Sequence, residues 1–287
     1  MTTRSQTADQ ASDGARDEIR EHRALKWRDG GTSTRTEKLA VEEPLEIRLG
    51  GRRFTLTMRT PGHDEDLAAG FLFAEGFINS ASELGEIRRV KDRKGAPEPN
   101  AIDIILNVPA DGLRQRLKRN FVISSSCGVC GKTSIDSILR RLEPLKHRAT
   151  AVSIAAATLL KLAPQMRDAQ TVFAATGGIH AAGLFDLNGT LSTLREDVGR
   201  HNAVDKVVGN ALMKEMIPLA NFVMMVSGRL SFEIVQKAAA AGVLILAAVS
   251  APSSLAVELA AETETTLVGF LRDGSFNVYT RPDRIAS

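Results

Sequence analysis

Cysteine is scarce in this 287-residue chain, which has two, at positions 127 and 130. No apolar run approaches the roughly 18 residues that suggest a membrane span, and the first 23 residues lack the apolar stretch of a secretory signal. A net charge of +3 is too small to indicate a nucleic-acid binder. These absences favour a cytoplasmic protein without membrane or nucleic-acid partners. In that compartment paired thiols stay reduced, so a structural disulfide is not expected.

The length allows one large domain or two modest ones, and an apolar content of 43% is ordinary for a globular protein. Residues 1–38 are rich in Thr, Ser, Asp, Glu and Arg and show no periodicity, which predicts a disordered tail. Trp27, the only tryptophan, would either dock this tail onto the body or be an isolated apolar residue.

The next stretch, residues 39–126, is predicted to be rich in strands. Apolar residues alternate at 45–49 and 54–58 on either side of Gly50-Gly51, which predicts a β-hairpin. The spacing of apolar residues in 64–78 predicts a helix. Two more strands are expected, at 87–90 and 102–108.

Residues 127–287 have the pattern of an α/β core, which could form one domain with the strand-rich part. Helices are expected at 133–142, 154–167, 203–214, 232–241 and 255–261. Strands are expected at 222–226, 243–249, 266–271 and 276–279. Near-continuous apolar strands that alternate with helices indicate a parallel or mixed sheet with helices on both faces.

The segment Ser124–Lys132 holds both cysteines, the predicted catalytic residues. Its serines and glycines indicate a loop that another molecule can approach closely. A helix starting near Thr133 would point its N–H groups at Cys130, and Lys132 adds a positive charge. Both effects favour the reactive thiolate at Cys127 and Cys130.

Three interpretations of this pair compete. A thioredoxin-like redox pair usually lies in a βαβ unit near the start of a chain, whereas about 120 mixed residues precede this one. A zinc site needs four ligands, and the chain has no second cysteine pair and no characteristic histidine spacing, so we predict no metal ligands. Thiol group transfer, in which a thiolate takes sulfur from a donor persulfide, needs the exposed cysteine that this loop offers.

Two histidines follow glycines. His180 comes after Gly177-Gly178 and would contact a ligand, relay a proton or be structural. The stretch Gly199–Asn202 is expected to open a helix. Arg200 and His201 would then lie where an anion binds, or at a solvated helix start with local salt bridges.

Two turns complete the candidate sites. Ser227-Gly228-Arg229 follows the strand 222–226, and ligands of open α/β sheets bind beyond the carboxyl ends of strands. Ser227 and Arg229 therefore predict an anion site, although the turn lacks the glycine pattern of a nucleotide-binding loop. From the residues alone, Phe270–Ser275 is a hairpin turn with Asp-Gly at its tip.

Together these stretches resemble the formate dehydrogenase accessory sulfurtransferase family (FdhD). Six motifs occur in the family's order from about residue 40 to the end of the chain. They are Cys127–Gly131, Thr176–Ala182, Glu196–His201, Ser227 with Arg229, Val235–Lys237 and Leu267–Phe270.

The resemblance implies a function, a fold and a site. A member accepts persulfide sulfur from a cysteine desulfurase and passes it to molybdenum bis(molybdopterin guanine dinucleotide), before this cofactor enters formate dehydrogenase. The implied fold is a cytidine deaminase-like α/β core, usually a homodimer. Cys127 would carry the persulfide with Cys130 as its partner. The implied cofactor-binding stretch is Phe270, Leu271, Arg272, Asp273, Gly274 and Ser275, and the other expected cofactor-binding residues are His180, Arg200, His201, Ser227 and Arg229. The cofactor's phosphates would meet Arg200, His201, Arg229 and Arg272.

A guanine nucleotide such as GDP could occupy the same site. Two alternatives remain open at this stage. One is a zinc-dependent, deaminase-like hydrolase that uses the cysteine pair. The other is a chaperone that holds the cofactor without sulfur chemistry.

Overall fold

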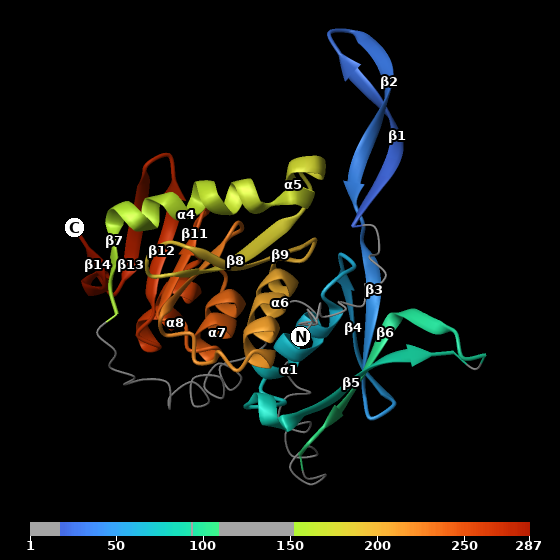
Figure 1. Ribbon diagram of the computed structural model, residues 1–287. Coiled ribbons are helices and arrows are strands. Elements are labelled where there is room, and N and C mark those ends of the chain that lie inside the picture. Colours follow the sequence, from blue (N-terminus) through green and yellow to red (C-terminus); the bar gives the residue numbers. More distant parts are fainter. Residues whose placement is uncertain (1–17, 93, 109–151) are drawn as a thin grey trace, which may run out of the picture.

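The computed structural model describes residues 18–92, 94–108 and 152–287 (Figure 1). Cys127, Cys130 and the helix predicted at 133–142 lie outside these residues, as does the predicted boundary between the two parts at 126/127.

An antiparallel ribbon of two strands precedes the body of the protein. Its strands are β1 (Ile19–Arg28) and β2 (Gly31–Ala40), joined by Asp29-Gly30, whose φ angles of 50° and 78° are those of a tight hairpin turn. The prediction of a disordered tail is therefore wrong for residues 19–38. Apolar residues are few in both strands because the ribbon has no buried face, so its only signs were the Asp-Gly pair and the short alternation at Leu25 and Trp27.

A four-stranded sheet follows, in the order β4-β3-β6-β5. Its members are β3 (Glu43–Leu49), β4 (Arg52–Arg59), β5 (Leu84–Lys91) and β6 (Pro97–Leu106), with the short helix η1 (Ala81–Glu83) before β5. The hairpin predicted around Gly50-Gly51 is confirmed, as is the helix after it, α1 (Asp64–Ala74). Leu45 and Ile47 of β3 are fully buried in the same apolar cluster as Leu67 and Leu72 of α1.

The second part of the chain forms a six-stranded sheet in the order β13-β12-β11-β10-β8-β9. Strands β10 to β12 are parallel, and each remaining neighbour is antiparallel, so the predicted mixed α/β sheet is confirmed. The strands are β8 (His180–Asp186), β9 (Leu191–Asp197), β10 (Phe222–Val226), β11 (Ile245–Ala248), β12 (Thr266–Arg272) and β13 (Ser275–Thr280). Two short strands, β7 (Ile154–Ala155) and β14 (Ile285–Ala286), pair beside it, the latter after η3 (Pro282–Arg284).

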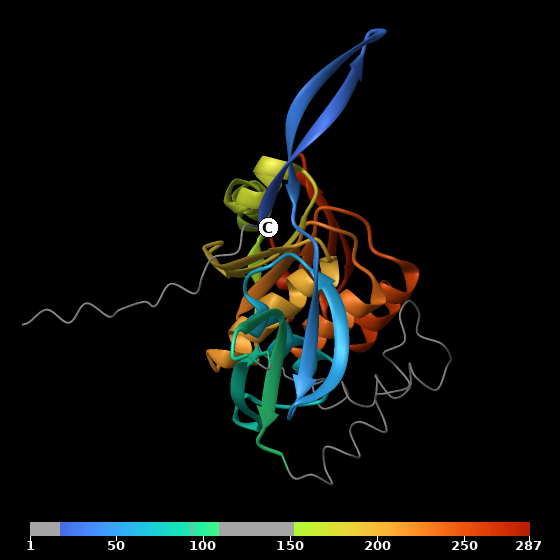
Figure 2. The same cartoon turned by 90° about the vertical axis from the view of Figure 1, so that its right-hand side faces the viewer.

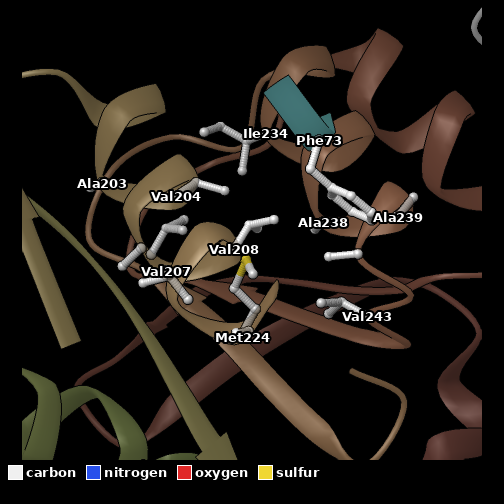
Figure 3. Close-up of a cluster of buried hydrophobic side chains, with 14 of the residues drawn as sticks. Phe73, Ala203, Val204, Val207, Val208, Met224, Ile234, Ala238, Ala239 and Val243 are labelled. Carbon is white, nitrogen blue, oxygen red and sulfur yellow. The ribbon is translucent and has the colours of Figure 1, made fainter. Parts of the chain in front are cut away.

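Helices cover both faces of this sheet (Figure 1). One face carries α6 (Arg200–Met213), α7 (Phe232–Ala240) and α8 (Ser254–Glu262), and the other carries α4 (Ala156–Ala169), which leads into α5 (Thr171–Thr176). Successive residues of β10 alternate between the two faces. Met224 lies among valines of α6 (Figure 3), whereas Val223 and Met225 belong to the cluster that includes Leu159 of α4.

Helix α1 joins the two sheets because it lies directly against α6. At the crossing, a Cβ atom on Gly70 would be 1.8 Å from the carbonyl oxygen of Asp205, and one on Gly209 would be 1.9 Å from that of Asp66. Only glycine permits so close an approach of two helices. A continuous apolar cluster runs from β3 through α1 and α6 to β10, so the strand-rich part and the α/β core share one core.

Candidate anion-binding site

The candidate site, called the anion edge below, lies at one end of the strands of the six-stranded sheet and holds His180, Arg200, Ser227 and Arg229. The parallel strand β10 ends there, and the turn after it leads into α7. Because β8 runs antiparallel to β10, its first residue, His180, reaches the same edge. Helix α6 begins there with Arg200, directly after β9. The sheet thus brings together three segments that are separate in the sequence, at the carboxyl end of β10 where ligands of open α/β sheets bind.

The turn Ser227-Gly228-Arg229 is the centre of this site. The amide nitrogen of Ser227 donates to the carbonyl oxygen of Ala181 at 2.9 Å, and its Oγ accepts from the amide of Ala181, also at 2.9 Å. A Cβ atom on Gly228 would lie 3.4 Å from Nδ1 of His180 and 3.8 Å from Cβ of Arg200. These are ordinary contact distances, so the turn lies directly against both His180 and Arg200.

Two guanidinium groups of the site have no carboxylate partner among the described residues. Arg200 is half-buried, and its Nε atom is buried without a hydrogen-bond partner in that part of the chain. Arg229 is exposed, and no ion pair joins it to any residue that the structure describes. A buried donor without a partner is costly, and a planar guanidinium matches the oxygens of phosphate or carboxylate. The pair therefore suits an anionic ligand.

The surroundings of His180 favour the neutral form of its imidazole. Burial is the main cause that lowers its pKa from the ordinary 6.5, and the positive charge of Arg200 lowers it further, against the opposing effect of Asp197. A neutral imidazole both donates and accepts one hydrogen bond. His180 can therefore contact a ligand without adding charge to the site.

His201 is oriented differently from its neighbour. Its Nε2 atom lies 2.8 Å from Oε2 of Glu233 and 3.4 Å from Oγ of Ser231, both at the start of α7. The hydrogen bond from His201 lowers the pKa of the Glu233 carboxyl group. His201 therefore ties the first turns of α6 and α7 together, and this nitrogen is already engaged.

The stretch Phe270–Ser275 closes β12 with a hairpin turn at Asp273-Gly274, as the Asp-Gly pair predicted. Its residues Arg272 to Ser275 are exposed. The amide of Phe270 donates to the carbonyl oxygen of Ser250 at 3.1 Å, at the end of the neighbouring strand β11. Leu271 points into the second apolar cluster and is fully buried, so it can offer a ligand only its backbone.

Buried contacts hold the start of α6 in place, instead of the solvated salt bridges that were one of the two expectations for this stretch. Asp197 is fully buried and accepts hydrogen bonds from the amide of Gly199 at 2.8 Å and from Nδ2 of Asn202 at 3.0 Å. It pairs with Nζ of Lys206 at 2.8 Å, and this ammonium also donates to the carbonyl oxygen of Thr60 at 2.9 Å. The only available signal was an aspartate two residues before a glycine, which is typical of an Asx turn.

Glu196, the neighbour of Asp197, has a capping role. Its carboxylate accepts hydrogen bonds from the amides of Val172 and Phe173 at 2.9 and 2.8 Å, at the start of α5. A carboxylate satisfies the free N–H groups of a first helical turn and suits its dipole. Glu196 therefore fixes α5 beside the strands that lead to the site.

In the described ranges, no group of three or more His, Cys, Asp and Glu residues could hold a metal ion. The two cysteines lie outside these ranges, so the zinc hypothesis stays a hypothesis. No helix in the same part of the chain is long and apolar enough to cross a membrane.

Comparison with known proteins identifies the family. The sequence model of the FdhD/NarQ family matches residues 40–286. The chain belongs to this family. A sulfur carrier protein FdhD from Mycolicibacterium paratuberculosis is 51% identical over 258 residues, which cover 89% of this chain and 94% of the relative. One from Sulfolobus acidocaldarius is 41% identical over 268 residues, which cover 93% and 99% of the two chains.

A solved FdhD/NarQ structure has the same fold. The crystal structure of a formate dehydrogenase accessory protein from Desulfotalea psychrophila superposes with a TM-score of 0.72 at 28% identity, over 93% of this chain and 99% of the other. The family resemblance drawn from six short motifs and the mixed α/β fold that it implied are both confirmed.

Proposed function

We propose that this chain is a sulfur carrier that takes part in the maturation of formate dehydrogenase. The support is the match with proteins named sulfur carrier protein FdhD, about half identical over nearly their full length. The name of the solved structure, a formate dehydrogenase accessory protein, indicates the recipient enzyme. The proposal includes a cysteine desulfurase as donor, a cytoplasmic location and a homodimer.

Cys127 accepts the sulfur in the proposed reaction. Its thiolate attacks the terminal sulfur of the donor's persulfide, the donor's S–S bond breaks, and the donor leaves as a thiolate. Cys127 then carries a persulfide, and no external oxidant or reductant is needed. The transfer of one sulfur from the donor to Cys127 therefore balances in atoms and electrons.

In the proposed release step, Cys130 resolves the persulfide. Its thiolate attacks the inner sulfur of the Cys127 persulfide, which forms a Cys127–Cys130 disulfide and expels sulfide toward the acceptor. The carried sulfur is reduced by two electrons and the two cysteines are oxidised by two. A cellular dithiol then reduces the disulfide and restores the carrier.

The acceptor in the proposal is molybdenum bis(molybdopterin guanine dinucleotide), bound as a substrate at the anion edge. Its phosphates suit Arg200 and Arg229, whose guanidinium groups have no carboxylate partner in the described ranges. His180, which lies against the turn at Gly228, would add a hydrogen-bonding group that favours its neutral form. GDP, which carries the guanine and phosphates of this substrate, serves as its probe.

A mass measurement tests the reaction. The protein is incubated with a cysteine desulfurase and cysteine, and its intact mass is recorded. We expect the wild type to gain one sulfur, Cys127→Ala to gain none, and Cys130→Ala to gain sulfur but to release little sulfide. An equal gain on the Cys127→Ala/Cys130→Ala variant would contradict the proposal. Full formate dehydrogenase activity in cells with the double variant would favour a chaperone without sulfur chemistry.

A further inference from the structure

The ribbon β1–β2 stands away from the body of the protein in two perpendicular views (Figures 1 and 2). Its foot contacts α5, which ends four residues before His180 of the candidate site, and its tip extends beyond α5 in Figure 1. A two-stranded ribbon is only marginally stable in water by itself. Among the described residues, no further strand pairs with either of its long edges.

The two faces of the ribbon differ in chemistry. Directly paired residues share a face, so the register places Trp27 and Leu25 on one face, opposite Thr32 and Thr34. Trp27 is 72% exposed and Leu25 is 69% exposed. Five of the seven large apolar residues exposed in the described chain lie on β1, β2 and β4: Leu25, Trp27, Leu39, Leu56 and Met58. Only Trp27 and Leu25 of these share one face of the ribbon, two residues apart near its turn, where they form an exposed apolar patch that can contact a protein.

Positive charge accompanies this apolar strip. Residues 19–40 contain six basic and three acidic side chains, an excess of three that equals the net charge of the whole chain. Arg23 lies on the face of Trp27, and Lys26 lies on the opposite face. A projecting basic arm attracts an acidic surface from a distance and speeds encounter.

The size of the ribbon indicates a transient contact rather than a stable dimer. Ten residues at about 3.3 Å each and two strands about 4.8 Å apart give a face of roughly 300 Å². A stable interface buries about 800 Å² on each partner, whereas weak, short-lived encounters bury less. A second copy of the chain held by this face alone would therefore not persist.

We propose that the β1–β2 ribbon docks onto an acidic surface of the recipient enzyme, where Trp27 and Leu25 enter an apolar pocket. The inference rests on the proposed function, because it takes formate dehydrogenase as the recipient. The foot of the ribbon contacts α5, which ends four residues before the edge that would hold the acceptor, so a protein approaching that edge to collect it meets the ribbon. The ribbon precedes almost all of the region that the family model matches, which begins at residue 40.

The single tryptophan allows a selective test. The chain is produced with fluorotryptophan, so that fluorine NMR gives one signal, from Trp27. Addition of unlabelled, cofactor-free formate dehydrogenase is expected to shift or broaden this signal, and the effect should weaken as salt rises. The Arg23→Glu/Lys26→Glu variant, which keeps Trp27, should bind at least tenfold more weakly.

The control is a variant with the same change of charge away from the ribbon. Lys91→Glu/Lys214→Glu alters two exposed lysines, at the end of β5 and just after α6, and should bind as the wild type does. An unchanged signal with the dehydrogenase would overturn the proposal. The proposal would also be overturned if the Trp27 signal shifted with the desulfurase alone, with polyuridylate as a nucleic-acid partner, or at higher concentration of the chain, which would indicate self-association.

The persulfide assay on the same variants separates this inference from the proposed function. Arg23→Glu/Lys26→Glu should still gain one sulfur from the desulfurase, because the ribbon takes no part in that step. Failure of every protein to gain sulfur would refute the carrier function. Normal sulfur gain without any response of Trp27 would refute only the docking role of the ribbon.

Discussion

Two charged regions of this molecule lie within a few residues of each other and behave in opposite ways. The first is the charged seam where α1, α6 and α7 meet the end of β9, formed by Asp66, Arg195, Asp197, Asp205, Lys206 and Lys237. In it each cation meets a carboxylate at 2.8 Å, as in the pairs Arg195–Asp66, Lys206–Asp197 and Lys237–Asp205. The second is the anion edge, where Arg200 and Arg229 have no such partner among the described residues.

The comparison shows that pairing, not composition, separates a structural charge from a binding charge. A buried cation with a carboxylate and further hydrogen bonds is satisfied and holds elements together. A cation at a sheet edge without a partner remains available to a ligand. One short motif serves both purposes, since Asp197 faces the seam and Arg200, three residues later, faces the edge.

The seam should respond most strongly to mutation. Lys206→Met removes the partner of Asp197 and leaves an uncompensated charge that is fully buried. We expect the free energy of unfolding to fall by about 3–5 kcal/mol, the usual cost of breaking a buried pair. Denaturation in urea, followed by circular dichroism, measures this loss.

The matched control is Lys214→Met, an exposed lysine immediately after α6. Its effect should stay within about 0.5 kcal/mol, as for most surface substitutions. If Lys206→Met cost no more than the control, the seam would not stabilise the fold and the contrast with the edge would fail.

The edge should show the reverse behaviour, with binding lost and stability kept. The Arg200→Gln/Arg229→Gln variant removes two charges that contact no described carboxylate, so its unfolding free energy should change little. Hydrogen bonds to charged groups contribute about 1.5–3 kcal/mol each. Affinity for GDP should therefore fall at least about tenfold.

Isothermal titration calorimetry with GDP measures this loss. Arg52→Gln, which removes an exposed arginine at the start of β4, is the control and should bind GDP as the wild type does. An unchanged affinity in the double variant would place the nucleotide elsewhere on the protein.

Much of the fold followed from periodicity because its strands and helices are strongly patterned. The apolar runs at 222–226 and 266–271 became β10 and β12 within one residue at each end. Strands β8 and β9 were missed. Their residues, including the small Ala181-Ala182-Gly183 and the charged Arg195–Asp197, have neither the bulk nor the alternation of a typical strand. They form strands because β10 offers its open edge to β8, and β8 to β9.

The candidate site was predictable in its members but not in its geometry. His180, Arg200 and Ser227 were each singled out by a glycine next to them or by the end of a strand. Their convergence depends on the antiparallel direction of β8, which no local pattern reveals. The partners of the seam, such as Thr60 with Lys206, lie 146 residues apart and can be found only after folding.

The smallest effect concerns His180, which reports on the electrostatics of the edge. Its pKa lies below 6.5, first because of burial and then because of Arg200. Arg200→Gln should raise this pKa toward 6.5, although not fully, since burial remains. GDP bound to the wild type should raise it too, because nearby phosphates favour the imidazolium.

NMR titration of the imidazole protons measures both shifts, with His180→Gln used to assign the signal. A depressed histidine pKa contributes stability that is complete above pH 6.5 and is lost as the pH falls through the folded-state pKa. His180→Gln should therefore remove a small part of the wild type's loss of stability below pH 6.5. A His180 that titrates at or above 6.5 would contradict the lowered pKa. A His180 pKa that neither Arg200→Gln nor GDP changes would mean that neither the arginine nor the ligand acts at this edge.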